Sequence, residues 1–312
     1  MKKLITILSI FAASSYTYGQ TAIEYSDKAD MQIERKDYQY AMVLIEKAIA
    51  LNDTNQWYYL KKSEIQFELS GPLDAIKIAK QAININNESP EPYNRVGNYY
   101  ESAGIVDSAI MMYDAAINYA NNDTARYSYI MNRGTAKSSN RDFKGAIKDY
   151  EKVLEFDTED IGALNNIAPA YRQLGMVDKS IKCLKKIISI DDSFIGPFVN
   201  LGFIYSKLDS LDLAIEYFDK ALVIDPEEAL VYSNRGYTYY KKEDYSKALK
   251  DINLSIKLYP TNSYAYRNLA LVYIAMDKID EACTVLSYAI KYGFERRYGS
   301  EVSELIRKYC GK

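Results

Sequence analysis

Small side chains recur at two fixed places along most of the chain, and their spacing defines a repeat. The repeats start 34 residues apart, except for one step of 37 residues. The three extra residues fall within the polar stretch Asn121 to Arg126, which we expect to form a turn. Numbered one to eight, the repeats cover residues 22–55, 56–89, 90–126, 127–160, 161–194, 195–228, 229–262 and 263–296.

Places 8 and 20 of every repeat hold a small residue. Those at place 8 are Ala29, Ser63, Gly97, Gly134, Ala168, Gly202, Gly236 and Ala270, and those at place 20 are Ala41, Ala75, Ala109, Ala146, Ser180, Ala214, Ala248 and Ala282. Place 4 holds a large aromatic or aliphatic residue, and tyrosine is frequent at place 11. Places 4, 8 and 11 share one helical face. The pattern therefore predicts two antiparallel helices in each repeat, packed closely at the small residues.

A single pair of short helices cannot bury its own apolar face, so the repeats must stack and share a core. The end of such a stack needs a cap. Residues 297–312 are predicted to provide a capping helix, because Val302, Leu305, Ile306 and Tyr309 follow the spacing of one helical face. The sequence thus predicts an all-α fold with eight helix pairs in residues 20–296 and a C-terminal cap.

The N-terminus has the layout of a secretory signal. Lys2 and Lys3 precede an apolar run from Leu4 to Ala13, and small and polar residues follow. The run has about ten residues, whereas a membrane span needs around 20. We therefore expect residues 1–19 to be a signal peptide, cleaved before Gln20. Export to the periplasm or another part of the cell envelope, or secretion, would follow.

Composition excludes several function classes. Histidine is absent, which removes imidazole bases, His-containing nucleophile pairs and His metal ligands. The 39 basic and 42 acidic residues give a net charge of −3, which offers no basic surface for nucleic acid. There is also no glycine-rich phosphate loop and no cysteine pair at metal-ligand spacing. We expect a protein that is not an enzyme, uses no cofactor or metal, and does not bind nucleic acid.

With these residues in view, residues 22–296 resemble the tetratricopeptide repeat family. Repeat six matches the family pattern best, through Phe198, Leu201, Gly202, Tyr205, Ala214, Phe218, Ala221 and Pro226. Repeats one, two and four depart from it at place 11, where they carry Gln32, Gln66 and Lys137. The resemblance implies a right-handed superhelical solenoid, in which the first helix of each pair lines a concave groove.

The family's geometry places residues 2, 5, 6, 9, 12 and 13 of each repeat on the groove wall. Place 6 is asparagine in five consecutive repeats: Asn132, Asn166, Asn200, Asn234 and Asn268. A side-chain amide both donates and accepts hydrogen bonds, which suits peptide main chain, and similar asparagine ladders in this family bind main chain. The alternative is that asparagine is merely tolerated at place 6, where it is common in the family. The sequence leaves both interpretations open.

The two ends of the expected groove wall differ in character. Repeats one to three contribute acids, among them Glu64 and Glu68. Repeats six to eight contribute aromatic candidates for binding, namely Phe203, Tyr237, Tyr240 and Tyr264. We therefore expect a partner segment with a basic end and an apolar end.

The sequence favours a non-catalytic scaffold or adaptor of the bacterial cell envelope that binds a peptide or protein segment in the concave groove. A carbohydrate-binding module is one alternative, because exposed tyrosines also stack on sugars. An accessory subunit of an envelope enzyme complex is another. The family's clamp for acidic C-terminal tails needs Lys and Asn at places 5 and 9 in a set order, which no three successive repeats supply. The oligomeric state stays open.

Three cysteines are present, and two of them are predicted to be bonded. Cys283 lies in the second helix of repeat eight, and Cys310 lies in the cap that should pack on that helix. In an oxidising compartment we expect a disulfide between them. The chain's end also resembles exported bacterial repeat proteins with a Leu-Ile-Xaa-Lys-Tyr-Cys-like tail. Cys183, in repeat five, is interpreted as a small core residue.

Overall fold

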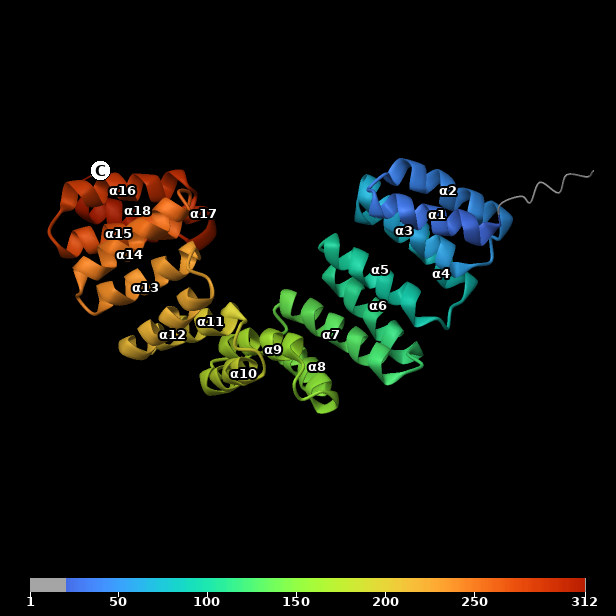
Figure 1. The fold of residues 1–312 in the computed structure, drawn as a ribbon, viewed down its shortest axis with the longest axis horizontal. Coiled ribbons are helices and arrows are strands. Elements are labelled where there is room, and N and C mark those ends of the chain that lie inside the picture. Colours follow the sequence, from blue (N-terminus) through green and yellow to red (C-terminus); the bar gives the residue numbers. More distant parts are fainter. Residues whose placement is uncertain (1–20, 312) are drawn as a thin grey trace, which may run out of the picture. The chain divides into compact units, whose positions relative to one another are not determined.

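The computed structural model describes residues 21–311, so the signal peptide expected at residues 1–19 lies outside the described residues. The described part consists of helices joined by short turns and contains no strand (Figure 1). The helices are α1 (Ala22–Glu34), α2 (Tyr38–Leu51), α3 (Gln56–Ser70), α4 (Pro72–Ile85), α5 (Pro90–Ser102), α6 (Val106–Tyr119), α7 (Asp123–Ser139), α8 (Phe143–Phe156), α9 (Ile161–Gln173), α10 (Val177–Ile190), α11 (Ile195–Lys207), α12 (Leu211–Ile224), α13 (Ala229–Lys241), α14 (Tyr245–Leu258), α15 (Ser263–Ala275), α16 (Ile279–Lys291), α17 (Phe294–Tyr298) and α18 (Glu301–Tyr309).

Helices α1 to α16 form eight antiparallel pairs, and the all-α repeat fold that the sequence predicted is confirmed. The turn within a pair is made at place 15, where the backbone has positive φ in seven repeats. The residues are Lys36, Gly104, Arg141, Gly175, Asp209, Glu243 and Asp277. A left-handed residue after the last helical turn ends the first helix and reverses the chain. The same local geometry therefore recurs with different side chains.

The small residue at place 8 makes room for a large one at place 24 of the same repeat. A Cβ added to Gly202 would lie 2.6 Å from Cε1 of Phe218, and one added to Gly97 would lie 2.6 Å from Cε1 of Tyr113. Phe218 and Tyr113 are fully buried. The two helices of a pair approach closely because glycine at place 8 leaves this space.

A partly buried ion-pair network, which the repeat pattern did not predict, joins neighbouring helices. Arg235 at place 7 donates from Nε to Oδ2 of Asp251 at 2.7 Å, and it also pairs with Asp219 of the preceding repeat. Asp251 is buried, whereas Asp219 is exposed. The same three places in repeats four and three hold Arg133, Asp149 and Asp114, with the same pairing. Each network joins one first helix to two second helices.

The chain divides into two compact parts, and the division falls within α8. The N-terminal half ends at Lys152 and the C-terminal half begins at Val153. Each half has its own apolar core. The C-terminal half contains the clusters built around Leu184 and Phe218.

Two segments differ from the expected boundaries. The polar stretch expected as a turn starts α7 at Asp123, so the inserted residues lengthen a helix instead of widening a turn. At the C-terminus, the short helix α17 precedes the expected capping helix, which is α18.

None of the helices described between residues 21 and 311 has the length and apolar character required to cross a membrane.

Candidate functional site

A pocket of about 350 Å³ lies in the C-terminal half. It is formed by the first helices α11, α13 and α15, the turn before α15, and the short helix α17. Its lining residues are Phe203, Leu230, Ser233, Asn234, Asn262, Tyr264 and Tyr298. The volume falls within the range of roughly 300–1,000 Å³ that is usual for ligand sites.

A narrow cleft adjoins this pocket and shares three of its residues, Phe203, Asn234 and Tyr264. The cleft adds Tyr237 and Lys207 to the lining. Four of the residues expected on the groove wall therefore lie together, although they come from three different repeats. Tyr240 lines neither cavity and packs between Tyr237 and Tyr245, with ring centroids 5.7 and 6.4 Å away.

Tyr264 is fixed in the pocket wall by aromatic contacts with α17. Its ring stacks on Phe294 with the centroids 6.0 Å apart, and the edge of Tyr298 approaches at 5.3 Å. Phe294 is fully buried, so it forms a rigid support. Burial raises the pKa of Tyr264, so its hydroxyl stays neutral and able to donate a hydrogen bond at physiological pH. Tyr298 was not predicted as a site residue because it lies outside the repeat pattern.

Arg267 contacts one tyrosine of the narrow cleft and one that lines both the cleft and the pocket. Its guanidinium carbon is 5.2 Å from the ring centroid of Tyr237 and 5.6 Å from that of Tyr264. Its Nε donates to Oε1 of Glu301, in α18, at 3.0 Å. Burial acts to lower the pKa of Arg267, but the hydrogen bond and charge of Glu301, together with Tyr264 and Tyr237, raise it overall. A permanent cation thus lies against the faces of both tyrosine rings.

A second pocket, of about 180 Å³, is formed by α9, the start of α10, α11 and the turn after α11. Its lining residues are Arg172, Val177, Phe203, Ile204, Lys207 and Leu208. Phe203 therefore borders both pockets. The charged groups of Arg172 and Lys207 each lie 5.6 Å from the centroid of its ring. These two cations give the second pocket a positive rim around an apolar floor.

The five asparagines at place 6 do not have equivalent surroundings. Asn268 is fully buried, where its Nδ2 donates to Ser233 and its Oδ1 accepts from Arg267. The prediction that Asn268 binds a ligand's main chain is therefore wrong, because its amide is enclosed and already used. In the N-terminal half, Asn132 donates to Oδ1 of Asn94 at 2.9 Å.

The other three place-6 asparagines are half-buried. Asn234 lines the 350 Å³ pocket, and no hydrogen bond joins its side-chain amide to another residue of the described chain. Asn200 lines a small separate cavity beside Pro169. Asn166 lies on α9 and lines none of these cavities. Of the five asparagines at place 6, Asn234 is thus the one that lines the 350 Å³ pocket.

The acids expected at the other end of the wall are partly neutralised inside the N-terminal half. Glu64 pairs with Arg95 at 3.2 Å, and Asp30 pairs with Lys61 at 2.6 Å. Their charge is therefore less available to a ligand than the sequence suggested.

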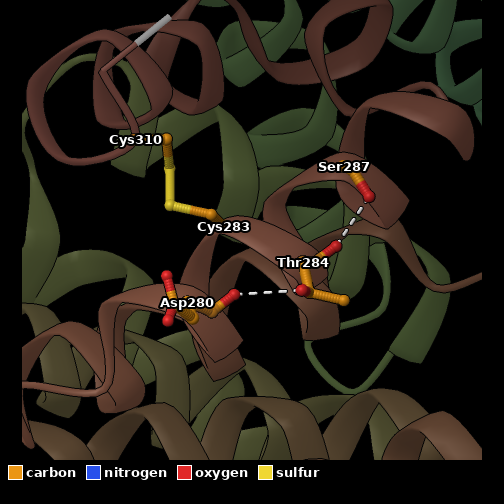
Figure 2. Close-up of a disulfide and its surroundings, with 5 residues drawn as sticks. All are labelled: Asp280, Cys283, Thr284, Ser287 and Cys310. Carbon is orange, nitrogen blue, oxygen red and sulfur yellow. Dashed lines mark hydrogen bonds between the residues drawn. A yellow bond between two sulfur atoms is a disulfide. The ribbon is translucent and has the colours of Figure 1, made fainter.

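A disulfide joins Cys283, in α16, to Cys310, at the end of α18 (Figure 2). The two Cα atoms lie 5.8 Å apart. On the same helix as Cys283, Thr284 and Ser287 donate to main-chain carbonyls, so these hydroxyls are used within α16. The bond attaches the capping helix to the last repeat, and buried Val302 completes the packing. Cys183 is half-buried against the core cluster around Leu184.

Comparison with known proteins gives one consistent family. Profiles described as tetratricopeptide repeat match residues 127–160, 161–194, 197–228, 229–262 and 252–284. A stretch of 98 residues is 32% identical to heat shock protein STI1 of Saccharomyces cerevisiae. That stretch is 31% of this chain but only 17% of the yeast protein.

Solved structures show the same fold at low identity. A tetratricopeptide repeat protein from Parabacteroides merdae superposes with a TM-score of 0.59 at 15% identity, covering 94% of this chain and 100% of that chain. The Cut9-Hcn1 hetero-tetramer of APC/C gives a TM-score of 0.59 at 16% identity, covering 90% of this chain and 54% of that chain. At identities this low, the solved structures show a shared fold. They do not indicate which ligand this chain binds.

Proposed function

The chain belongs to the tetratricopeptide repeat family, and on that premise we propose that it is a non-catalytic scaffold of the bacterial cell envelope that binds a peptide segment of another protein. The binding site in this proposal is the groove of the C-terminal half, defined by Phe203, Asn234, Tyr237, Tyr264 and Tyr298.

The observation that carries the proposal is the 350 Å³ pocket, because it combines aromatic walls with an available amide. Phe203, Tyr264 and Tyr298 offer large apolar surfaces, and aromatic residues of this kind dominate binding energy at interfaces. Asn234 offers both a donor and an acceptor to peptide main chain. An apolar side chain entering the pocket would bring its own main chain close to this amide.

The envelope location rests on two further observations. The Lys-rich start and the apolar run of residues 1–19 are typical of a secretory signal. The disulfide between Cys283 and Cys310 supports export as well, because such bonds persist in oxidising compartments and are rare in the cytosol.

The test is an affinity capture with the mature chain, residues 20–312, from envelope extract, followed by binding measurements on each captured protein. Phe203→Ala and Tyr264→Ala should each weaken binding of a true partner by about 2 kcal/mol, roughly thirty-fold. Tyr259→Ala is the matched control, because Tyr259 is an exposed tyrosine on the second-helix side that lines neither pocket. The melting temperature of each variant shows that it is folded.

Partners that bind both pocket variants as tightly as the parent chain would place the interaction elsewhere. A glycan array provides the competing outcome. If sugars bind and depend on Phe203 and Tyr264 while peptides do not, the groove is a carbohydrate site and the proposal fails.

A further inference from the structure

We propose that the segment bound in this groove carries a carboxylate side chain between two apolar side chains, and that Arg172 and Lys207 select it. This inference rests on the proposed function and specifies the chemistry of the partner.

Two cations near the groove have no ion-pair partner in the described part of the fold. Neither Arg172 nor Lys207 pairs with a carboxylate anywhere in residues 21–311. Two other cations of the C-terminal half do form ion pairs: Lys241 pairs with Asp209 at 2.8 Å, and Arg267 pairs with Glu301. Arg172 and Lys207 therefore remain at the rim of the groove without a carboxylate partner among residues 21–311.

Lys207 lines both the second pocket and the narrow cleft that opens into the 350 Å³ pocket. Phe203 borders all three cavities. If one apolar side chain occupies each pocket, the stretch of chain between them passes over Phe203 and beside Lys207. A residue in that connecting stretch meets the positive rim.

The ring of Phe203 holds both cations at the groove. Arg172 and Lys207 both contact the face of Phe203, which restrains their charged groups at the groove instead of leaving them extended in solvent. An arginine in this position can still use its N–H groups for a bidentate bond to a carboxylate. The site is thus prepared for an acidic side chain.

The sequence predicted an apolar end of the partner at repeats six to eight, whereas the groove there also has a positive rim. The expected basic end of the partner came from acids of the N-terminal half, of which Glu64 and Asp30 pair internally. At the aromatic groove itself a basic ligand would be repelled by Arg172 and Lys207, because no acid of the described chain pairs with either of them. The groove favours acidic-apolar segments.

The test starts from a library of random peptides displayed internally in a carrier protein, so that no free C-terminus is present. The mature, disulfide-intact chain selects binders, and the enriched peptides are then made with acetylated and amidated ends. We expect enrichment of Asp or Glu flanked by large apolar residues. Binding should weaken as salt is raised.

Charge-reversal variants then assign the residues. Arg172→Glu or Lys207→Glu should weaken a selected peptide by at least about ten-fold, whereas Lys250→Glu should have no effect. Lys250 is an exposed control on α14 that lines neither pocket. Replacing the peptide's acid by lysine should abolish binding to the parent chain and restore it to Lys207→Glu.

The outcomes separate the two proposals. If selected peptides depend on Phe203 but are neutral or basic, or bind the charge-reversed variants normally, this inference fails and the proposed function stands. If a peptide whose sole carboxylate is its free C-terminus binds better than the internal acid, the inference is also overturned. If no selected peptide depends on Phe203, both proposals fail.

Discussion

Arg267 of the last repeat donates to Glu301 of the capping helix, and the same guanidinium lies over the rings of Tyr237 and Tyr264. The cap and the groove are therefore joined through one side chain. The side chain of Arg267 is 10% exposed and that of Glu301 is 44% exposed, so the pair lies at the edge of the core. Removing the acid leaves a nearly buried cation without its partner.

We expect Glu301→Ala to lower the free energy of unfolding by about 2 kcal/mol, between the values usual for surface and buried pairs. Urea unfolding measures this change. Glu304→Ala is the control, because Glu304 bonds only to Ser300 at the helix start. Equal stability of the two variants would show that Arg267 does not depend on Glu301.

Reduction of the disulfide should destabilise the C-terminal half. The bond closes a sequence separation of 27 residues, for which loop entropy predicts about 3 to 4 kcal/mol. We expect the same fall in melting temperature for the parent chain in reductant and for Cys283→Ser without it. If Cys283→Ser melts like the oxidised parent, packing of α18 alone is enough to fix the cap.

The close helix approach in repeat six gives a test with an internal control. Gly202→Ala should destabilise by about 1–3 kcal/mol, because the new methyl group overlaps Phe218. Gly196→Ala in the same helix meets only an ordinary contact at 3.4 Å with Phe194, so helix propensity should make it neutral or stabilising by up to about 1 kcal/mol. Thermal unfolding of both variants measures these two changes in stability. Phe218→Leu should partly rescue Gly202→Ala.

Two asparagines at the same place of adjacent repeats should behave in opposite ways. Asn268→Ala removes the hydrogen-bond partner of Nη1 of Arg267 and of Oγ of Ser233 in the core, and we expect a loss of about 2 kcal/mol in stability. Asn234→Ala should leave stability nearly unchanged and weaken a peptide bound in the groove. Unfolding curves and titration of a selected peptide compare them. A stable Asn268→Ala variant would contradict the assignment.

The repeat fold could be predicted because its determinants lie within one repeat. Gly202 and Phe218, for example, belong to the same helix pair, so their complementary sizes recur with the 34-residue period. The aromatic character of Phe203, Tyr237 and Tyr264 was also visible, because each lies on the first helix of its repeat. These residues converge in the structure because successive first helices stack.

The contacts of the place-6 asparagines could not be predicted in the same way, because they depend on residues that differ from one repeat to the next. Whether an asparagine at place 6 is available depends on its neighbours. Asn268 is enclosed by Ser233 of the preceding repeat and by Arg267, whereas Asn234 is not enclosed in this way. Tyr298 was missed because α17 follows the last repeat and no period applies to it.

The extra turn of α7 shows which changes in length such a chain tolerates during evolution. Residues Asp123 to Arg126 extend the helix by about 6 Å at its beginning, and Arg126 bonds to the carbonyl of Ala120 in the preceding connection. Despite the insertion of three residues, α7 ends at place 13 of its repeat, as α5 and α9 do. The side chains after the insertion therefore keep their angular positions around the helix. An insertion inside the helix by one or two residues would rotate the packing face by about 100° or 200° and break the stack. We therefore expect that length differences among homologues of this chain lie mainly at the starts of helices.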